Sequence, residues 1–188
     1  NGNNQDDVET ISLPFTFKFY GQEYDEISIC SNGWIAMGDT DLESFRNYQI
    51  PGVGGPAKMI AVFWDDLKLS NGGRVYTWHD QIEKKFYVEW SEVRTYQNNS
   101  LETFQAVLYD PSYYITPTGD GEILLQYKEF NNTSYGSYSW DQTHGLYCSV
   151  GIEDHTMSRG LQYTFNDTYH PAAMELSDET AVLITTRG

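Results

Sequence analysis

The sequence predicts an all-β fold, an antiparallel β-sandwich with little helix, and three observations carry this prediction. Short runs rich in Val, Ile, Tyr, Phe and Thr recur along the 188 residues, separated by Gly, Asn, Asp and Pro. Several runs alternate between apolar and polar residues, which is typical of strands with one covered face. Almost no segment has a helical apolar period. Two sheets packed face to face would cover one face of every such strand.

The alternation is clearest near the start of the chain, where Phe15, Phe17 and Phe19 fall on one face and Thr16 and Lys18 on the other. Similar alternation recurs at 86–90 and 104–108. The predicted strands are 14–20, 25–30, 33–38, 58–64, 73–79, 85–91, 103–109, 122–128, 146–153, 161–165 and 181–186.

Turn chemistry supports these boundaries. Asn32-Gly33 predicts a tight hairpin, because this pair tolerates the positive φ that primed turns require. Further Gly- and Asn-rich turns are expected at 70–73 and 118–121. Helical turns are expected only in 39–48 and 171–176. The polar, aromatic segment 131–145 is expected to form a long surface loop.

Length and composition indicate one domain, with a polar lead-in over 1–12 and a single β-sandwich over 13–188. Asp and Glu number 27 and Lys and Arg 11, a formal net charge of −16 that counts against nucleic-acid binding. No apolar run of 18 residues is present, so membrane insertion is not expected. The acids concentrate toward both ends of the chain. They form either a solvated surface or, in part, the ligands of a cation.

The two cysteines, Cys30 and Cys148, both lie in predicted strands. A disulfide between them would close a long loop and stabilise the fold by roughly 4 kcal/mol. Two buried thiols in neighbouring strands are equally compatible with the sequence. Neither cysteine has the spacing of a metal site or a redox motif.

Seven segments, taken in order, resemble the nidogen-like extracellular β-domain. They are 13–21 (LPFTFKFYG), 30–35 (CSNGWI), 60–67 (IAVFWDDL), 73–76 (GRVY), 88–90 (VEW), 103–109 (TFQAVLY) and 123–127 (ILLQY). They are more closely similar to β-sandwich modules of large secreted bacterial proteins, which often lie beside peptidase or adhesion domains. The resemblance implies a jelly-roll or nidogen-like sandwich that acts as a non-catalytic, extracellular accessory module with neighbouring domains. It carries over no binding residues.

Asp65 and Asp66, directly after an apolar run, are the leading candidates for a metal site, with Asp39, Asp41 and Asp120 as further contributors. Carboxylates at a strand end offer the oxygen ligands that Ca²⁺ prefers. The alternative is that these acids accept hydrogen bonds from the turn backbone. No EF-hand spacing is present.

The aromatic residues divide into a core group on the apolar runs and a group among polar residues. The second group comprises Trp78, Tyr113, Tyr114, Tyr135, Tyr138, Trp140 and Tyr147. Exposed rings flanked by Asn, Gln and Asp suit sugar faces, whose hydroxyls pair with the polar side chains. Contact with another protein, or packing over the sandwich edge, would use the same residues. Trp140, Tyr138, Tyr135 and Trp78 are the candidate ligand-binding residues.

Catalysis has little support. The four histidines are scattered, and no Gly-x-Ser-x-Gly, His-Glu-x-x-His or Cys–His pairing is present. Glu89 and Glu92 flank Trp90 and would form a glycosidase pair only if a turn brought them onto one face. We therefore expect no enzyme. The expected function is a module that binds a polysaccharide or a cell-surface protein, with a structural spacer as the alternative.

Overall fold

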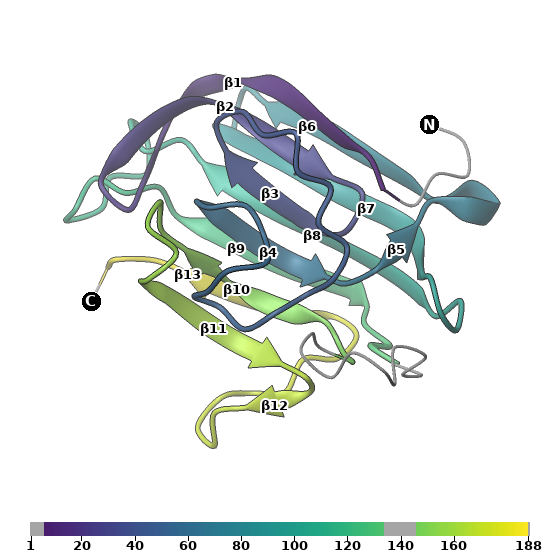
Figure 1. Ribbon diagram of the computed structural model, residues 1–188. Coiled ribbons are helices and arrows are strands. Elements are labelled where there is room, and N and C mark those ends of the chain that lie inside the picture. The colour runs from purple at the N-terminus through teal and green to yellow at the C-terminus, as the bar shows by residue number, and fades with distance from the viewer. Residues whose placement is uncertain (1–5, 134–145, 188) are drawn as a thin grey trace.

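The computed structural model describes residues 6–133 and 146–187, and they form two antiparallel sheets packed face to face (Figure 1). The first sheet has the order β1-β2-β3-β4-β10-β11-β12. Its strands are β1 (Val8–Phe19), β2 (Gln22–Cys30), β3 (Trp34–Met37), β4 (Met59–Trp64), β10 (Ser149–Glu153), β11 (Gly160–Phe165) and β12 (Thr168–Tyr169).

The second sheet has the order β13-β9-β8-β7-β5, and β6 also pairs with β7. Its strands are β5 (Leu67–Lys68), β6 (Arg74–Asp80), β7 (Lys85–Thr95), β8 (Leu101–Tyr109), β9 (Ile123–Glu129) and β13 (Thr180–Ile184). The predicted β-sandwich is therefore confirmed. The sequence did not predict the order of the strands. In that order β10 pairs with β4 in the first sheet and β13 pairs with β9 in the second.

The first strand is longer than predicted. It begins at Val8, so residues 8–12 of the expected polar lead-in belong to the first sheet. Val8 and Ile11 explain this extension, because each packs against a buried cluster of the sandwich. The strand is interrupted by a register shift between Ser12 and Phe17, around Pro14.

The segment that was expected to hold helical turns over 39–48 is not helical, and neither is 171–176. Instead, segment 38–58 lies over the outer face of the first sheet. The carbonyl of Ser44 accepts hydrogen bonds from the indole Nε1 atoms of Trp34 and Trp64, at 2.9 Å each. These two bonds hold the segment in an irregular path. The one helix in the described ranges is the 3₁₀ turn Ser70–Gly72.

The predicted hairpin at Asn32-Gly33 is confirmed, since β2 pairs with β3. Gly33 has a φ of +79°, and a Cβ at this position would lie 1.9 Å from the carbonyl oxygen of Phe63. Asn32 is fully buried, and its Oδ1 accepts the Leu67 N–H at 2.9 Å. The turn therefore joins β2 and β3 to β4 and β5.

An aromatic stack fills the centre of the core. Phe104 of β8 lies between Phe63 of β4 and Trp90 of β7, with ring centroids 5.2 Å apart on both sides. Two hydrogen bonds cross between the sheets, from Trp90 Nε1 to the Cys30 carbonyl and from the Tyr127 hydroxyl to the Val62 carbonyl. Because each buried donor has a partner, the aromatic core is stabilised without unpaired polar groups.

Candidate functional site

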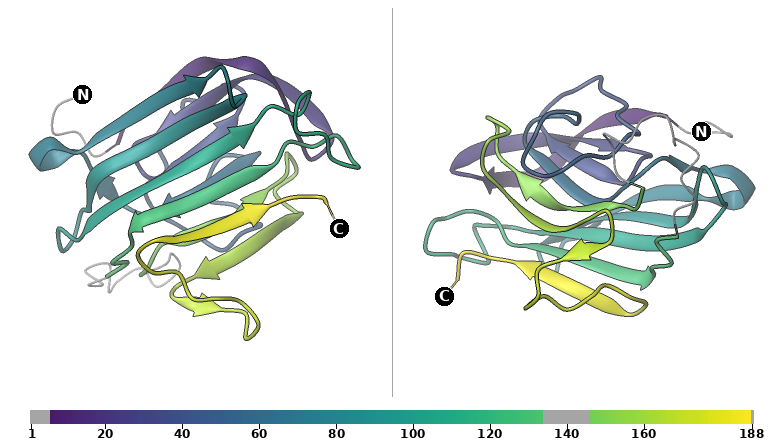
Figure 2. Two further views of the ribbon diagram at one scale, coloured as in Figure 1. Left: turned by 180° about the vertical axis from the view of Figure 1, so that it is seen from behind. Right: turned by 60° about the horizontal axis from the view of Figure 1, so that its bottom comes forward.

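The two outer faces of the sandwich differ in how far they are exposed to solvent. The first sheet is covered by segment 38–58, which buries Trp34 and Trp64 to 0% and 1% exposure. The second sheet presents its outer face to solvent, and Figure 2 (left) shows its strands from that side. On that face Trp78 is 59% exposed and Leu183 52% exposed. The open face of the second sheet is thus the extended surface on which apolar side chains remain accessible.

One row of apolar side chains crosses this face at right angles to the strands. Trp78 pairs with Tyr87, Tyr87 with Val107, Val107 with Leu124, and Leu124 with Leu183. We call these five residues the outer apolar row. Their register places one of them on each of five adjacent strands, so the row extends over roughly 19 Å at the usual strand spacing. Its two ends, Trp78 and Leu183, are exposed, whereas Val107 at its centre is 1% exposed. Sequence alternation alone cannot reveal such a row, because it depends on strand order and register.

The exposed end of the outer apolar row is aromatic. The ring centroids of Trp78 and Tyr87 lie 5.1 Å apart, with 32° between the ring planes. Tyr76, two residues before Trp78 on the same face of β6, is 57% exposed. Burial raises the pKa of Tyr87, so its phenol is neutral at pH 7. These rings form an uncharged aromatic surface on β6 and β7.

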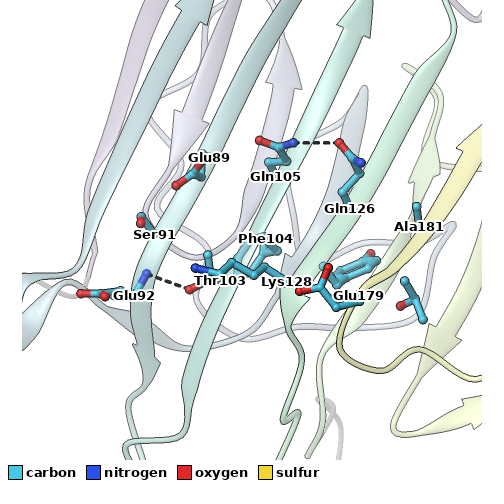
Figure 3. A pocket seen from close by; sticks show the side chains of 12 residues that line it. Glu89, Ser91, Glu92, Thr103, Phe104, Gln105, Gln126, Lys128, Glu179 and Ala181 are labelled. Atoms are coloured by element: carbon cyan, nitrogen blue, oxygen red, sulfur yellow. Dashed lines mark hydrogen bonds between the residues drawn. The ribbon is translucent and has the colours of Figure 1, made fainter.

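A second row, of polar side chains, lies beside the first. Glu89, Gln105 and Gln126 occupy neighbouring positions on β7, β8 and β9, between Tyr76 and Ala181. Gln105 Nε2 donates a hydrogen bond of 2.7 Å to Gln126 Oε1. We call these three residues the amide row. The Gln105 oxygen and the Gln126 nitrogen point away from their shared bond (Figure 3), where they can accept from and donate to a ligand.

The amide row forms one side of a hollow of about 380 Å³ on the outer face. Two irregularities accompany the hollow. The register shift between Trp90 and Val93 adds a residue to β7. The shift between the Phe104–Tyr127 and Thr103–Glu129 pairs adds Lys128 to β9. Glu92 has a φ of +53° at the first shift. The hollow is further lined by Ser91, Glu92, Thr103, Lys128 and Glu179.

Hydrogen bonds hold the two bulges together. The Glu92 N–H donates to Thr103 Oγ1 at 3.1 Å (Figure 3), and Thr103 Oγ1 donates to Glu129 Oε2 at 2.8 Å. Glu89 and Glu92, three residues apart, both line the hollow because the bulge adds a residue between them. A simple strand would have placed them on opposite faces.

The other side of the outer apolar row has a cation among aromatic rings. The Lys85 ammonium lies 5.0 Å from the ring centroid of Tyr109 and 5.6 Å from that of Tyr114. Lys85 also forms an ion pair of 3.5 Å with Glu83. The aromatic surface is therefore bordered by hydrogen-bonding groups on both sides, which is the arrangement that fixes the orientation of a ligand over an apolar platform.

Of the four candidate ligand-binding residues, Trp78 lies on this face. Tyr135, Tyr138 and Trp140 fall within 134–145, outside the described residues. The sequence did not identify Tyr76, Tyr87, Gln105 or Gln126 as site residues, and it identified Glu89 only as half of a glycosidase pair. The sequence pattern that could have revealed the aromatic surface is the spacing of Tyr76 and Trp78, because two residues separated by one lie on the same face of a strand.

The metal candidates are not brought together. The Asp65 N–H donates to the Asn32 carbonyl beyond the end of β2, whereas Asp120 Oδ1 accepts the Gly21 N–H before its start. β2 has nine residues, so these two sites are roughly 30 Å apart. Asp39 accepts a hydrogen bond from Thr10, at 2.8 Å. Within 6–133 and 146–187, no group of three or more His, Cys, Asp or Glu side chains is placed to hold a metal ion.

Asp65 instead belongs to a buried acidic region. Burial raises its pKa to about 8, and Asp66 and Glu102 raise it further while the Asp66 N–H lowers it. Glu102 is fully buried and accepts hydrogen bonds from the N–H groups of Asn131 and Asn132, at 2.8 and 3.1 Å. Burial raises the pKa of Glu102 to about 7. Both carboxyls accept backbone N–H groups at this end of the sandwich, Asp65 from Asp66 and Glu102 from Asn131 and Asn132.

The cysteines are not bridged: both are free and buried. β3 and β4 separate Cys30 on β2 from Cys148 beside β10, so three strand spacings, roughly 14 Å, lie between them. A disulfide requires Cα atoms within about 7 Å. Cys30 also belongs to the cluster beneath segment 38–58, whereas Cys148 belongs to the core between the sheets. The disulfide considered from the sequence is therefore incorrect, and the thiols do not lie in neighbouring strands.

No helix in the described part of the chain has the length and apolar character needed to cross a membrane. A family model described as NIDO related matches residues 1–186. No curated protein and no solved structure gives a significant match. The match covers nearly the whole chain and includes all seven segments that resemble the nidogen-like domain. The chain therefore belongs to the NIDO-related family of nidogen-like domains.

Proposed function

We propose that this chain is an extracellular, non-catalytic accessory module that binds a glycan across the open face of its second sheet. One observation carries the proposal: the outer apolar row crosses five strands, and the amide row lies beside it on the three central ones. An apolar row alone would suit many partners. The adjacent amides make a glycan the best fit, because a sugar ring has an apolar face and a rim of hydroxyls.

Trp78 and Tyr87 would stack against the ring face of a sugar unit. Gln105, Gln126 and Glu89 would pair with its hydroxyls, since a side-chain amide both donates and accepts and a carboxylate accepts. The exposed ends of the row, Trp78 and Leu183, lie four strand spacings apart, so an extended oligosaccharide that contacts both would span several units. The hollow beside Lys128 would accept a substituent that projects from the chain.

A glycan array with the purified domain tests this proposal. The parent protein is expected to bind at least one class of neutral or amino-sugar polysaccharide, and Trp78→Ala is expected to reduce that binding at least tenfold. Tyr96→Ala is the matched control, because Tyr96 is an exposed aromatic residue outside both rows. Equal binding by the parent and by Trp78→Ala would exclude the open face as the glycan site.

The arrangement of the terminal strands favours a second function, that of a spacer between neighbouring domains. Val8 pairs with Cys30 at one end of β2, while Thr186 bonds Thr118 near the opposite end (Figure 1). The chain thus enters and leaves at opposite ends of the sandwich, as expected of a module that separates its neighbours. A spacer would show no binding on the array, whichever variant is tested.

A further inference from the structure

The four lateral edges of the two sheets differ in their protection against pairing with another strand. Edge strands normally carry charges, Pro, bulges or very short lengths that discourage added strands. β1 has Pro14 and a register shift, β6 has Arg74 and Asp80 at its ends, and β12 has two residues. β13 has the sequence Thr-Ala-Val-Leu-Ile and none of these features.

β13 has a high β propensity and an open edge. It pairs with β9 on one side, and within the described residues no second strand pairs with it. Its alternate residues Val182 and Ile184 pack against the core, while Leu183 belongs to the outer apolar row. An uncharged strand with a free edge is a template for main-chain hydrogen bonds from another segment.

An apolar hollow of about 290 Å³ lies between the two sheets at the carboxyl end of β13. Ile184 lines it from β13, Ile123 from β9, and Ile152 and Leu161 from β10 and β11. Leu161 is 61% exposed. A strand paired with β13 would direct every second side chain to the same side as Val182 and Ile184, and the side chain beside Ile184 would face this hollow. The edge and the hollow therefore fit one ligand, an extended peptide with alternating apolar side chains.

The charges around β13 define the peptide further. Glu175, Asp178 and Glu179 are exposed just before the strand, and Asp178 also accepts the Phe130 N–H. Arg159 and Asp120, of opposite charge, both line the hollow near the other end of the strand. A peptide antiparallel to β13 would thus meet acids at its carboxyl end, so basic residues there would be complementary.

We infer that the free edge of β13 binds an extended peptide of another protein, with alternating apolar residues and basic residues at its carboxyl end. This site is distinct from the glycan face, because the added strand would use the backbone edge of β13 and the inner hollow. The inference does not rest on the proposed glycan binding. A second copy of the chain would present its own acidic segment 175–179 and its own sandwich at this edge, so an isolated peptide segment is the better match.

The test uses ¹⁵N-labelled protein and the synthetic peptide Ac-Thr-Val-Thr-Val-Thr-Val-Lys-Lys-NH₂. We expect amide shift changes confined to 180–186 and 159–161. Replacing both lysines of the peptide by glutamate should weaken binding at least fivefold. The protein variant Leu161→Asp should also bind the original peptide at least fivefold more weakly. Because Leu161 is exposed, this variant is expected to fold. Trp78→Ala should bind the peptide as the parent does, which separates this site from the glycan face.

Three results would overturn the inference. One is the absence of shift changes at millimolar peptide. Another is equal binding by a peptide in which every backbone nitrogen is methylated, because such a peptide cannot donate the ladder hydrogen bonds. The third is a concentration-dependent shift of 180–186 without peptide, accompanied by a dimer in sedimentation. That result would assign the edge to a second copy of the chain.

Discussion

The ring centroids of Trp78 and Tyr87 lie 5.1 Å apart on adjacent strands, on the outer face of the second sheet. Trp90, on the same strand as Tyr87, points the opposite way into the core and is fully buried. The two tryptophans thus mark the two sides of one sheet. Their contrast allows binding and stability to be tested separately.

Trp78→Ala is expected to change the free energy of unfolding by about 0.5 kcal/mol or less, because an exposed side chain contributes little packing. Trp90→Ala should cost about 3–5 kcal/mol, since it removes a large buried ring. It also removes the hydrogen bond to the Cys30 carbonyl. Urea denaturation followed by circular dichroism measures both values. A large loss in Trp78→Ala would mean that the outer apolar row is structural.

Gly33→Ala is expected to destabilise the fold by about 3 kcal/mol or more, because the added Cβ clashes with backbone at a positive φ. The contact at issue is the 1.9 Å approach to the Phe63 carbonyl oxygen. Gly72→Ala is the matched control: its φ is also positive, but no atom lies within 4 Å of the added Cβ. Thermal melts of the two variants would contradict this account if their midpoints were equally lowered.

Stability is expected to fall as pH rises from 5 to 8.5. Burial raises the pKa of Asp65 to about 8 and those of Glu102 and Glu153 to about 7. A carboxyl with a higher pKa in the folded than in the unfolded chain binds more protons when folded, so each rise in pH lowers the free energy of unfolding. The stabilisation is complete below about pH 4 and is lost as pH passes through 7 and 8.

Asp65→Asn should flatten this pH dependence, and at pH 8.5 it should be more stable than the parent by about 2 kcal/mol, because a neutral amide has no ionisation penalty. Glu26→Gln, at an exposed position of β2, is the control and should follow the parent. The measurement is the melting midpoint across the pH series. A midpoint that rises from pH 5 to 8.5 in the parent would be inconsistent with the buried acids described.

The native protein should not react with Ellman's reagent. Burial raises the pKa of Cys30 to about 12 and raises that of Cys148 well above its usual value, so neither thiol forms the reactive thiolate at pH 8. In denaturant, two thiols per chain should react. Fewer than two thiols in denatured, unreduced protein would indicate a disulfide and would contradict the separation of the two strands.

The fold was largely predictable, because local alternation and turn chemistry determine which residues form strands. Phe17 and Phe19 are buried as their spacing indicates, and Asn32-Gly33 forms the expected hairpin. Strand order was not predictable from local pattern. It depends on contacts between distant segments, such as β4 with β10, and so the separation of Cys30 from Cys148 could not be foreseen.

The site was predictable only in part. Trp78 was identified as an aromatic residue in polar surroundings, but its partner Tyr87 was assigned no role. The amide row requires the register of β7, β8 and β9, and a shift by one residue would have put Gln105 and Gln126 in the core. Asp65 and Asp120 illustrate the same limit, because sequence spacing does not tell which end of a sandwich a turn occupies.

The most direct test of the central claim is chemical-shift mapping of the glycan that binds best on the array, titrated into ¹⁵N-labelled protein. The account predicts shift changes at the amides of β6, β7, β8 and β9 and of the indole of Trp78, with binding weakened at least tenfold in Gln105→Ala/Gln126→Ala. The control variant Tyr96→Ala should retain the parent's affinity. Shift changes centred on another surface, with the open face unaffected, would contradict the claim.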